Sequence, residues 1–240
     1  MMLRTGFNIY GIKTGILCLE SYYSKLPGHI KNASTFEFPV RYKIVKGATP
    51  ERIVELADMS LLEPFIEAAR ELEKEGIEAI TTSCGFLCLF QKEIAEAVNI
   101  PVFTSSLIQV PMLSKMLGKH RKIGIITASK SLLTSKHFTA AGIDPSSVRV
   151  VGMDGKEEFN KVIIKRKTTV LNVDKLRDEV LAIVKELIEG PDDLGAIVLE
   201  CTDLSPFIDD IRAITRLPIF DIVTLTKMVY NSLPLAKNLL

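Results

Sequence analysis

The sequence lacks a long apolar run. No stretch of its 240 residues approaches the roughly 20 apolar residues that a membrane-spanning helix needs. The apolar run at 15–19 is also too short for a signal peptide. These absences predict a cytoplasmic protein that does not enter membranes. Its four cysteines are then expected to be reduced, and a chain of this length needs no disulfide to fold.

An excess of charge of one sign is also missing, because the formal net charge is +1 at pH 7. Basic residues are scattered, and the densest run, at 165–167, is typical of a solvated loop or strand edge. The sequence therefore predicts no nucleic-acid partner. It also contains no metal-ligand spacing of histidines, no serine-hydrolase elbow and no phosphate-binding glycine loop. We accordingly predict no bound metal.

Short apolar runs alternate with longer stretches of helical period. The alternation predicts an α/β protein with parallel sheets. Two amphipathic stretches, Pro50–Gly76 and Val173–Glu189, are predicted helices. The predicted strands are Tyr10–Leu19, Arg41–Val45, Ala79–Thr82, Ile100–Thr104, Lys122–Thr127, Val148–Val151, Ala196–Glu200 and Leu217–Asp221.

The chain repeats itself around two cysteines. The stretch Ala79–Cys84 resembles Ala196–Cys201, and a strand that starts at proline follows each cysteine at equal distance (101 − 84 = 17; 218 − 201 = 17). We interpret this as an internal duplication, although any two βαβ units look partly alike. Two lobes leave a cleft between them, and each cysteine lies just past a strand end, where such sheets bind ligands.

Cys84 lies between a strand and a helix expected to begin near Phe86. The positive end of that helix should lower the pKa of the thiol. Ser83 and nearby N–H groups can bind a substrate carboxylate, and Gly85 lets the chain turn without blocking the approach.

Cys201 lies in a similar setting, before a helix start that Ser205 and Pro206 predict. Thr202 can donate a hydrogen bond to an anion. Taken alone, either cysteine is more typical of a small buried hydrophobe. As a matched pair they point to catalysis, whereas Cys18 and Cys88 have no counterpart and are predicted core residues.

Two thiols on opposite faces of a substrate can racemise a carbon next to a carboxylate. One removes the proton as a thiolate, and the other returns a proton from the opposite side. No cofactor is needed if the pocket stabilises the carbanion.

These residues resemble the aspartate/glutamate/hydantoin racemase superfamily. Its first cysteine motif is similar to Thr82–Gly85 and its second to Glu200–Asp203. The resemblance implies two flavodoxin-like lobes with parallel sheets and an interlobe cleft, each lobe supplying one cysteine, and no pyridoxal phosphate. It also implies a first lobe of residues 1–105 plus 221–240, a second lobe of residues 106–220, and a possible homodimer.

The second motif departs from the family, because Glu200 replaces a usual glycine and Asp203 a usual histidine. Carboxylates beside Cys201 should disfavour its thiolate, so we expect Cys201 to be the proton donor and Cys84 the thiolate. They also cast doubt on the usual substrate, because a carboxylate such as Glu20, Glu200 or Asp203 would favour an ammonium-bearing substrate and disfavour a dicarboxylic acid.

Three further segments, Pro27–Asn32, Phe38–Tyr42 and Lys46–Arg52, are similar to a branch labelled only as racemase-like. By this resemblance Asn32 borders the substrate, although a surface turn explains it equally well. Thr127 either contacts substrate from the second lobe or caps the following segment.

The leading prediction is a cofactor-independent two-cysteine racemase or epimerase, acting on an aspartate- or glutamate-like amino acid or a related carboxylate. Its site residues are Cys84 and Cys201 as catalysts, with Asn32, Ser83, Gly85, Phe86, Thr127 and Thr202 binding substrate. One alternative is an isomerase or decarboxylase of a small carboxylic acid in which a single cysteine acts. Another is a two-lobed binding protein without turnover.

Overall fold

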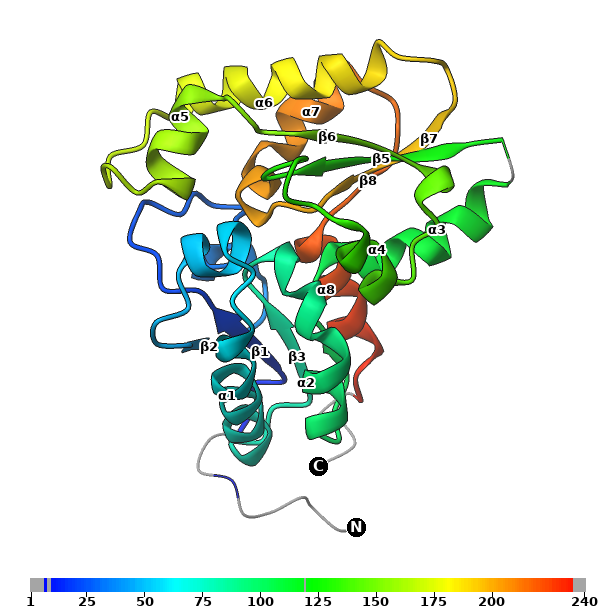
Figure 1. Ribbon diagram of the computed structural model, residues 1–240. Helices are drawn as coiled ribbons and strands as arrows, with labels where there is room; N and C mark the ends of the chain where they lie inside the picture. Colours follow the sequence, from blue (N-terminus) through cyan, green and yellow to red (C-terminus); the bar gives the residue numbers. More distant parts are fainter. Residues whose placement is uncertain (1–6, 8–9, 119, 235–240) are drawn as a thin grey trace.

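The computed structural model describes residues 7, 10–118 and 120–234, which form two α/β lobes, each built on a parallel four-stranded sheet (Figure 1). The strand orders are β2-β1-β3-β4 and β6-β5-β7-β8. The strands are β1 (Thr14–Cys18), β2 (Val40–Ile44), β3 (Ala79–Thr82), β4 (Val102–Phe103), β5 (Lys122–Thr127), β6 (Val148–Gly152), β7 (Leu194–Leu199) and β8 (Ile219–Phe220). The α-helices are α1 (Leu62–Lys74), α2 (Gln91–Ala97), α3 (Val110–Leu117), α4 (Ser135–Ala141), α5 (Glu157–Phe159), α6 (Val173–Ile188), α7 (Ile208–Ile214) and α8 (Ile222–Ser232).

The two lobes repeat the same unit, as the sequence repeat predicts. In each, the third strand is followed by a 3₁₀-helix, a seven-residue α-helix and a two-residue strand: η4 (Gly85–Phe90), α2 and β4 in the first lobe, η8 (Thr202–Phe207), α7 and β8 in the second. Equal element lengths over the whole unit agree with the equal 17-residue spacing in the sequence. The expected α/β class with two lobes is confirmed.

A glycine in each central strand lets a helix pack closely on its sheet. A Cβ atom on Gly15 would stand 2.8 Å from the Leu72 side chain of α1, and one on Gly124 would stand 2.6 Å from the Leu187 side chain of α6. Both leucines are fully buried. Gly15 is therefore a packing residue, and Gly124 matches it in the second lobe.

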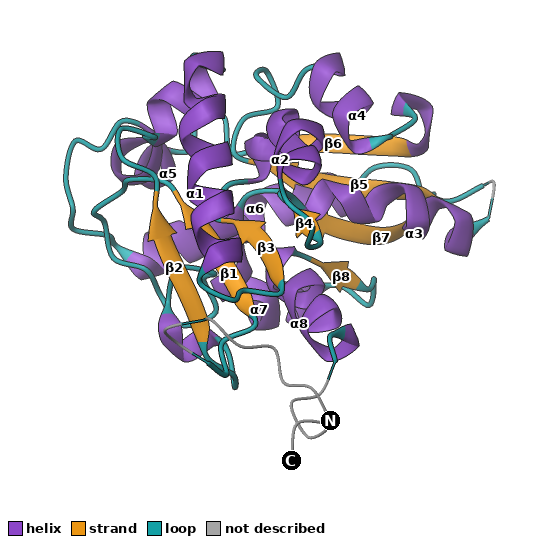
Figure 2. Cartoon of the chain, turned by 90° about the horizontal axis from the view of Figure 1, so that it is seen from below, coloured by secondary structure: helices purple, strands orange, loops and turns teal. Residues whose placement is uncertain are grey.

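Helices α3 and α8 connect the lobes by crossing over. Helix α3 follows β4 of the first sheet but packs on β5 and β7 of the second, whereas α8 follows β8 and packs beside β3 of the first. In Figure 1, α8 (red) accordingly lies with the lower lobe, and Figure 2 shows helices around the strands of both sheets. The division at residues 105 and 220 stays a prediction.

All eight predicted strands are present, but one predicted helix is not continuous. The stretch Pro50–Gly76 contains a π-helical turn, η2 (Glu51–Glu55), and a 3₁₀-turn before α1 begins at Leu62. The interruption occurs at Asp58, whose carboxylate accepts hydrogen bonds from the Ser60 N–H and from Arg52. Such local side-chain bonds compete with continued α-helix.

The predicted helix starts after the cysteines are wrong in detail. The segment after each cysteine first forms a 3₁₀-helix, so α2 begins only at Gln91 and α7 at Ile208. Ser205 caps neither element, because it and Pro206 lie inside η8. No helix in the part of the chain that is described has the length and apolar character needed to cross a membrane.

Candidate active site

A small cavity is lined by both lobes. The loop after β1 and the segments that follow β3 and β7 line it together. Two π-helical turns, η2 and η7 (Asn160–Ile164), contribute apolar side chains from opposite lobes. The apolar side chains of these turns at the cavity are Val54, Ile163 and Ile164.

Cys84 and Cys201 both line this cavity, each two residues after the end of its strand. Cys84 is partly exposed and Cys201 is 7% exposed. Their loops touch directly, because the Thr202 hydroxyl donates a hydrogen bond of 2.9 Å to the Ser83 carbonyl. The two cysteine motifs thus line one cavity, while their catalytic role stays a prediction.

The thiol of Cys84 is not a ready thiolate. Burial raises its pKa well above the ordinary value, the Glu200 carboxylate raises it further, and the Phe86 N–H only partly opposes them. The expected lowering of this pKa is therefore wrong. The reason is that a short 3₁₀-turn has little dipole, whereas removal from water and a neighbouring carboxylate act strongly.

The thiol of Cys201 is held in its protonated form. Burial raises its pKa well above the ordinary value, and the carboxylates of Asp203 and Glu200 add to the effect. Its Sγ stands 4.0 Å from Asp203 Oδ2, in a geometry where the thiol donates. This agrees with the expectation that Cys201 is protonated at rest.

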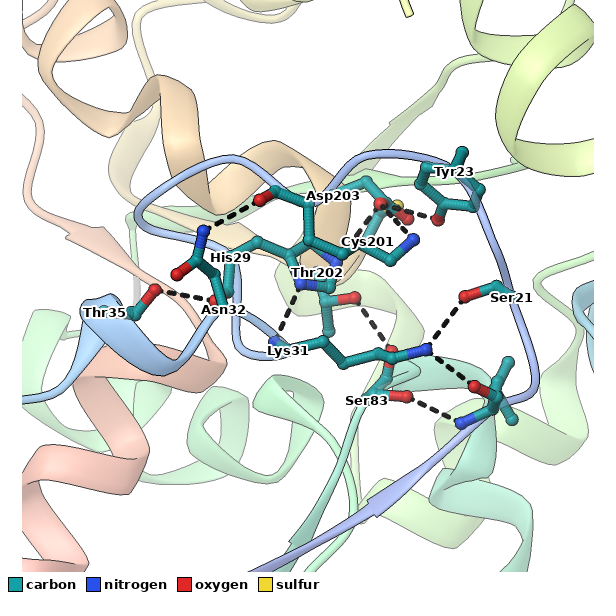
Figure 3. A network of polar contacts seen from close by, with 12 residues as sticks. Ser21, Tyr23, His29, Lys31, Asn32, Thr35, Ser83, Cys201, Thr202 and Asp203 are labelled. Atoms are coloured by element: carbon teal, nitrogen blue, oxygen red, sulfur yellow. Dashed lines mark hydrogen bonds and ion pairs between the residues drawn. The ribbon is translucent and has the colours of Figure 1, made fainter. Parts of the chain in front are cut away.

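Asp203 is the centre of a buried polar network that joins the two lobes (Figure 3). Its Oδ1 accepts hydrogen bonds from the Tyr23 hydroxyl at 2.7 Å and from His29 Nε2 at 3.2 Å. The Lys31 N–H donates to His29 Nδ1 at 2.8 Å, so the proton of the neutral ring lies on Nε2. Burial alone would raise the pKa of Asp203, but Lys25, His29 and Tyr23 together hold it well below its ordinary value.

Two lysines of the same loop give the cavity its positive charge. Lys31 Nζ donates to the Leu19 carbonyl at 2.7 Å and to Ser21 Oγ at 3.0 Å. Lys25 Nζ lies 2.8 Å from the centre of the Tyr23 ring. Burial lowers the pKa of Lys25 to about 7, although Asp203 opposes this.

Glu200 is buried beside the first cysteine loop. Its Oε2 accepts hydrogen bonds from the Thr127 hydroxyl at 2.7 Å and from the Ala128 N–H at 3.4 Å. Burial raises the pKa of Glu200 to about 7, and these two bonds oppose it. A Cβ atom on Gly85 would stand 2.2 Å from Glu200 Oε1, so this glycine is needed for the close approach of the two loops.

Of the predicted substrate-binding residues, four line the cavity and two do not. Ser83, Gly85, Phe86 and Thr202 are in its wall. Asn32 instead caps a 3₁₀-turn by accepting from the Ser34 N–H, and its amide donates to the Lys25 carbonyl. Thr127 reaches the site only through Glu200.

The two other cysteines are core residues, as predicted, since Cys18 is 1% and Cys88 0% exposed. Within residues 7, 10–118 and 120–234, no group of three His, Cys, Asp or Glu side chains is placed to hold a metal ion.

The loop that follows β1 was predicted to border the substrate only around Asn32, and the residues by which it lines the cavity were missed. Its contributions to the cavity occur at every second residue over 19–25, followed by His29 and Lys31. No sequence pattern marks these positions, because residues 20–25 are all polar or tyrosine. The contact that explains their role joins Tyr23 to Asp203, 180 residues later.

The chain is similar to proteins named as dimethylsulfoniopropionate lyases. One from Durusdinium sp. clade D is 35% identical over 224 residues, which cover 90% of this chain and 73% of that protein. Dimethylsulfoniopropionate lyase 7 of Emiliania huxleyi is 31% identical over 221 residues, which cover 88% of this chain but only 64% of that protein. No protein-family model matches the chain.

Solved structures with the same fold include racemases. Allantoin racemase from Klebsiella pneumoniae matches with a TM-score of 0.58 at 14% identity, covering 91% of this chain and 87% of that one. Glutamate racemase from Francisella tularensis matches with a TM-score of 0.53 at 15% identity, covering 92% and 80%. The resemblance to the racemase superfamily is confirmed at the level of the fold.

The predicted amino-acid racemase is wrong. The relatives that share a third of the sequence over most of the chain are lyases of a sulfonium compound by name, not racemases. The prediction failed because a pair of cysteines on this fold was taken to mean proton removal and return at one carbon, whereas the relatives are named for an elimination. The departures from the family motif at Glu200 and Asp203, which cast doubt on the usual substrate, were the more informative feature of the sequence.

Proposed function

The chain belongs to the dimethylsulfoniopropionate lyase family, and from that premise we propose that it eliminates dimethyl sulfide from dimethylsulfoniopropionate or a closely related sulfonium carboxylate. The observation that carries the proposal is the cavity itself, which holds two thiols together with lysines and carboxylates. This substrate carries one positive and one negative charge, so a cavity with charges of both signs suits it better than it suits a dicarboxylic acid.

The reaction balances with a single base. The base removes a proton from the carbon next to the carboxylate, and the electron pair of that C–H bond becomes the new carbon–carbon double bond. The bond from the next carbon to sulfur breaks, and its electrons leave with the sulfur. The products are acrylate, neutral dimethyl sulfide and one proton, which the base passes to water.

Cys84 is the proposed base, since it is the more exposed thiol and the Phe86 N–H favours its thiolate. Its raised pKa means that the free protein holds it mostly as a thiol. A bound sulfonium supplies the missing positive charge, which lowers the pKa of the thiol at the moment when a base is needed. Cys201, held protonated beside Asp203, is proposed to stabilise the developing carbanion as a hydrogen-bond donor, without transferring its proton.

The test measures dimethyl sulfide released from dimethylsulfoniopropionate by gas chromatography. We expect release by the natural chain and a loss of roughly 10²–10⁴-fold in Cys84→Ser, because general-base catalysis contributes about that much. Cys88→Ala is the control, since that buried thiol contacts the His137 carbonyl and does not line the cavity. A folded natural chain that releases no dimethyl sulfide overturns the proposal.

Stereochemistry tests the single base separately. One base removes only one of the two hydrogens on the carbon next to the carboxylate. Substrate carrying a single deuterium there, in either configuration, should give unlabelled acrylate from one enantiomer and deuterated acrylate from the other. Equal loss from both enantiomers, measured by mass spectrometry, contradicts the assignment of one base.

A further inference from the structure

Two charged groups of the cavity have a polar atom without a hydrogen-bond partner in the described chain. They are Nζ of Lys25 and Oε1 of Glu200, and both atoms are buried. Unpartnered buried polar atoms are rare in native proteins, and their desolvation is costly. Here the two atoms have opposite charge and belong to residues that line the same cavity.

The hydrogen bonds of Glu200 Oε2 hold the carboxylate in place and so fix the position of Oε1. Thr127 and Ala128 hold Oε2, which leaves Oε1 against Gly85, one residue from the proposed base Cys84. A sulfonium has no N–H or O–H to donate, so its counter-ion needs charge and contact rather than a hydrogen-bond partner. Glu200 Oε1 belongs to a carboxylate that lines the cavity, and it accepts no hydrogen bond in the described chain.

The free ammonium of Lys25 is fixed by aromatic and ionic contact. It lies over the Tyr23 ring and 3.9 Å from Asp203 Oδ1, an oxygen that already accepts from Tyr23 and His29. Its N–H groups are therefore left to donate to another acceptor, and a substrate carboxylate is such an acceptor.

We infer that Lys25 and Glu200 bind the two opposite charges of the substrate, Lys25 taking the carboxylate and Glu200 facing the sulfonium. The inference rests on the proposed function and adds the orientation of the substrate and the origin of its specificity. The cavity has two lysines, Lys25 and Lys31, against two carboxylates, Glu200 and Asp203, so their formal charges cancel. Each charge of a zwitterion then meets an opposite charge, whereas a second carboxylate would meet Glu200.

The pKa values of the two residues agree with this placement. Burial brings both Glu200 and Lys25 to about 7, so each is a charge that its surroundings only partly stabilise. A bound group of opposite charge restores the ionised form of each.

Three probes that do not carry the sulfonium separate the two contacts. 3-(Trimethylammonio)propionate has both charges, 4,4-dimethylpentanoate has the same shape without the cation, and propyltrimethylammonium lacks the carboxylate. Binding of each is measured by titration calorimetry at pH 7, the pKa to which burial brings both Lys25 and Glu200. We expect the natural chain to bind the first probe at least tenfold more tightly than either of the others, which is about 1.4 kcal/mol.

Each variant should lose one preference only. Glu200→Gln should bind 3-(trimethylammonio)propionate no more tightly than 4,4-dimethylpentanoate, while its affinity for the latter is unchanged. Lys25→Met should lose the preference over propyltrimethylammonium. Glu96→Gln and Lys92→Met, from an exposed pair on α2, are the matched controls and should change neither ratio.

The inference is overturned if the natural chain does not distinguish the cationic probe from its neutral isostere, a result that needs no variant to fold. It is also overturned if the two variants exchange their effects. Dimethyl sulfide release is measured on the same samples. Release without charge preference refutes the inference and leaves the lyase, whereas the two expected losses without any release refute the lyase and leave the charge placement.

Discussion

Gly85 sets the distance between the two cysteine loops, so Gly85→Ala should damage the site more than the fold. A Cβ atom at this position would stand 2.4 Å from the Glu200 carbonyl oxygen, where real Cβ atoms keep at least 3.0 Å, so the loops must separate by 0.6 Å or more (3.0 − 2.4 = 0.6). The carbonyl cannot move away easily, because the Glu200 N–H is bonded to the Ile126 carbonyl at 2.8 Å.

The expected loss follows from that displacement. A shift of about 1 Å in a reacting group lowers activity by roughly 10²-fold, so kcat/KM for dimethyl sulfide release should fall by about that factor. Overpacking costs about 1–3 kcal/mol of unfolding free energy. For a chain of this size each kcal/mol lowers Tm by about 2–4 °C, which calorimetry resolves.

Gly155→Ala is the control, because nothing lies within 4 Å of its added carbon but its φ is +75°. It should lose about 1–2 kcal/mol through the left-handed backbone and keep its activity. If Gly85→Ala keeps both the kcat/KM and the Tm of the natural chain, the close approach of the two loops is not a requirement of the site.

Three other perturbations test the electrostatics. Thr127→Val removes a hydrogen bond that lowers the pKa of Glu200, so that pKa should rise above about 7. The acid limb of the pH–rate profile should then move to higher pH. An unmoved limb argues against a role for ionised Glu200. Asp203 has a folded-state pKa below its unfolded value of about 3.9, so its stabilisation is present above that pH and is lost as pH falls through the folded pKa. Asp203→Asn should therefore be less stable than the natural chain at pH 7, and urea unfolding should show the difference shrinking below about pH 4 rather than staying constant. Iodoacetamide should modify Cys84 more slowly than free cysteine at pH 7.5, because burial raises the pKa of this thiol, and peptide mass spectrometry showing equal rates contradicts that reason.

The sequence was sufficient for the strands because buried parallel strands are apolar on both faces and short. Even β4 and β8, with two residues each, were recognisable from the proline that starts each run. It was insufficient for Pro50–Gly76, where helical periodicity continues through Asp58 although the side chain of that residue turns the backbone. A side-chain bond of this kind overrides a pattern of apolar residues.

The site was predictable in its position but not in its electrostatics. The repeat located Cys84 and Cys201 at strand ends, and the topology of the sheets brings strand ends together. The pKa of each thiol depends first on burial, which no motif reports. The charged groups of the loop after β1 gain their role from Asp203, a partner far away in the sequence.

The symmetry of the backbone and the asymmetry of the charges together explain how a racemase fold can serve an elimination. Ser83 and Glu200 occupy equivalent places: the Ser83 hydroxyl accepts from the Leu19 N–H, and the Glu200 carboxylate accepts from the equivalent N–H of Ala128. One lobe thus has a neutral hydroxyl where the other has a buried carboxylate. Racemisation and elimination share their first step, the removal of a proton next to a carboxylate, and differ in what the carbanion does next. A carbanion beside a good leaving group expels it before a second thiol can return the proton. If the proposed function holds, selection of a cationic leaving group by one buried carboxylate is the change that separates the elimination from a racemisation, with both thiols kept at equivalent strand ends.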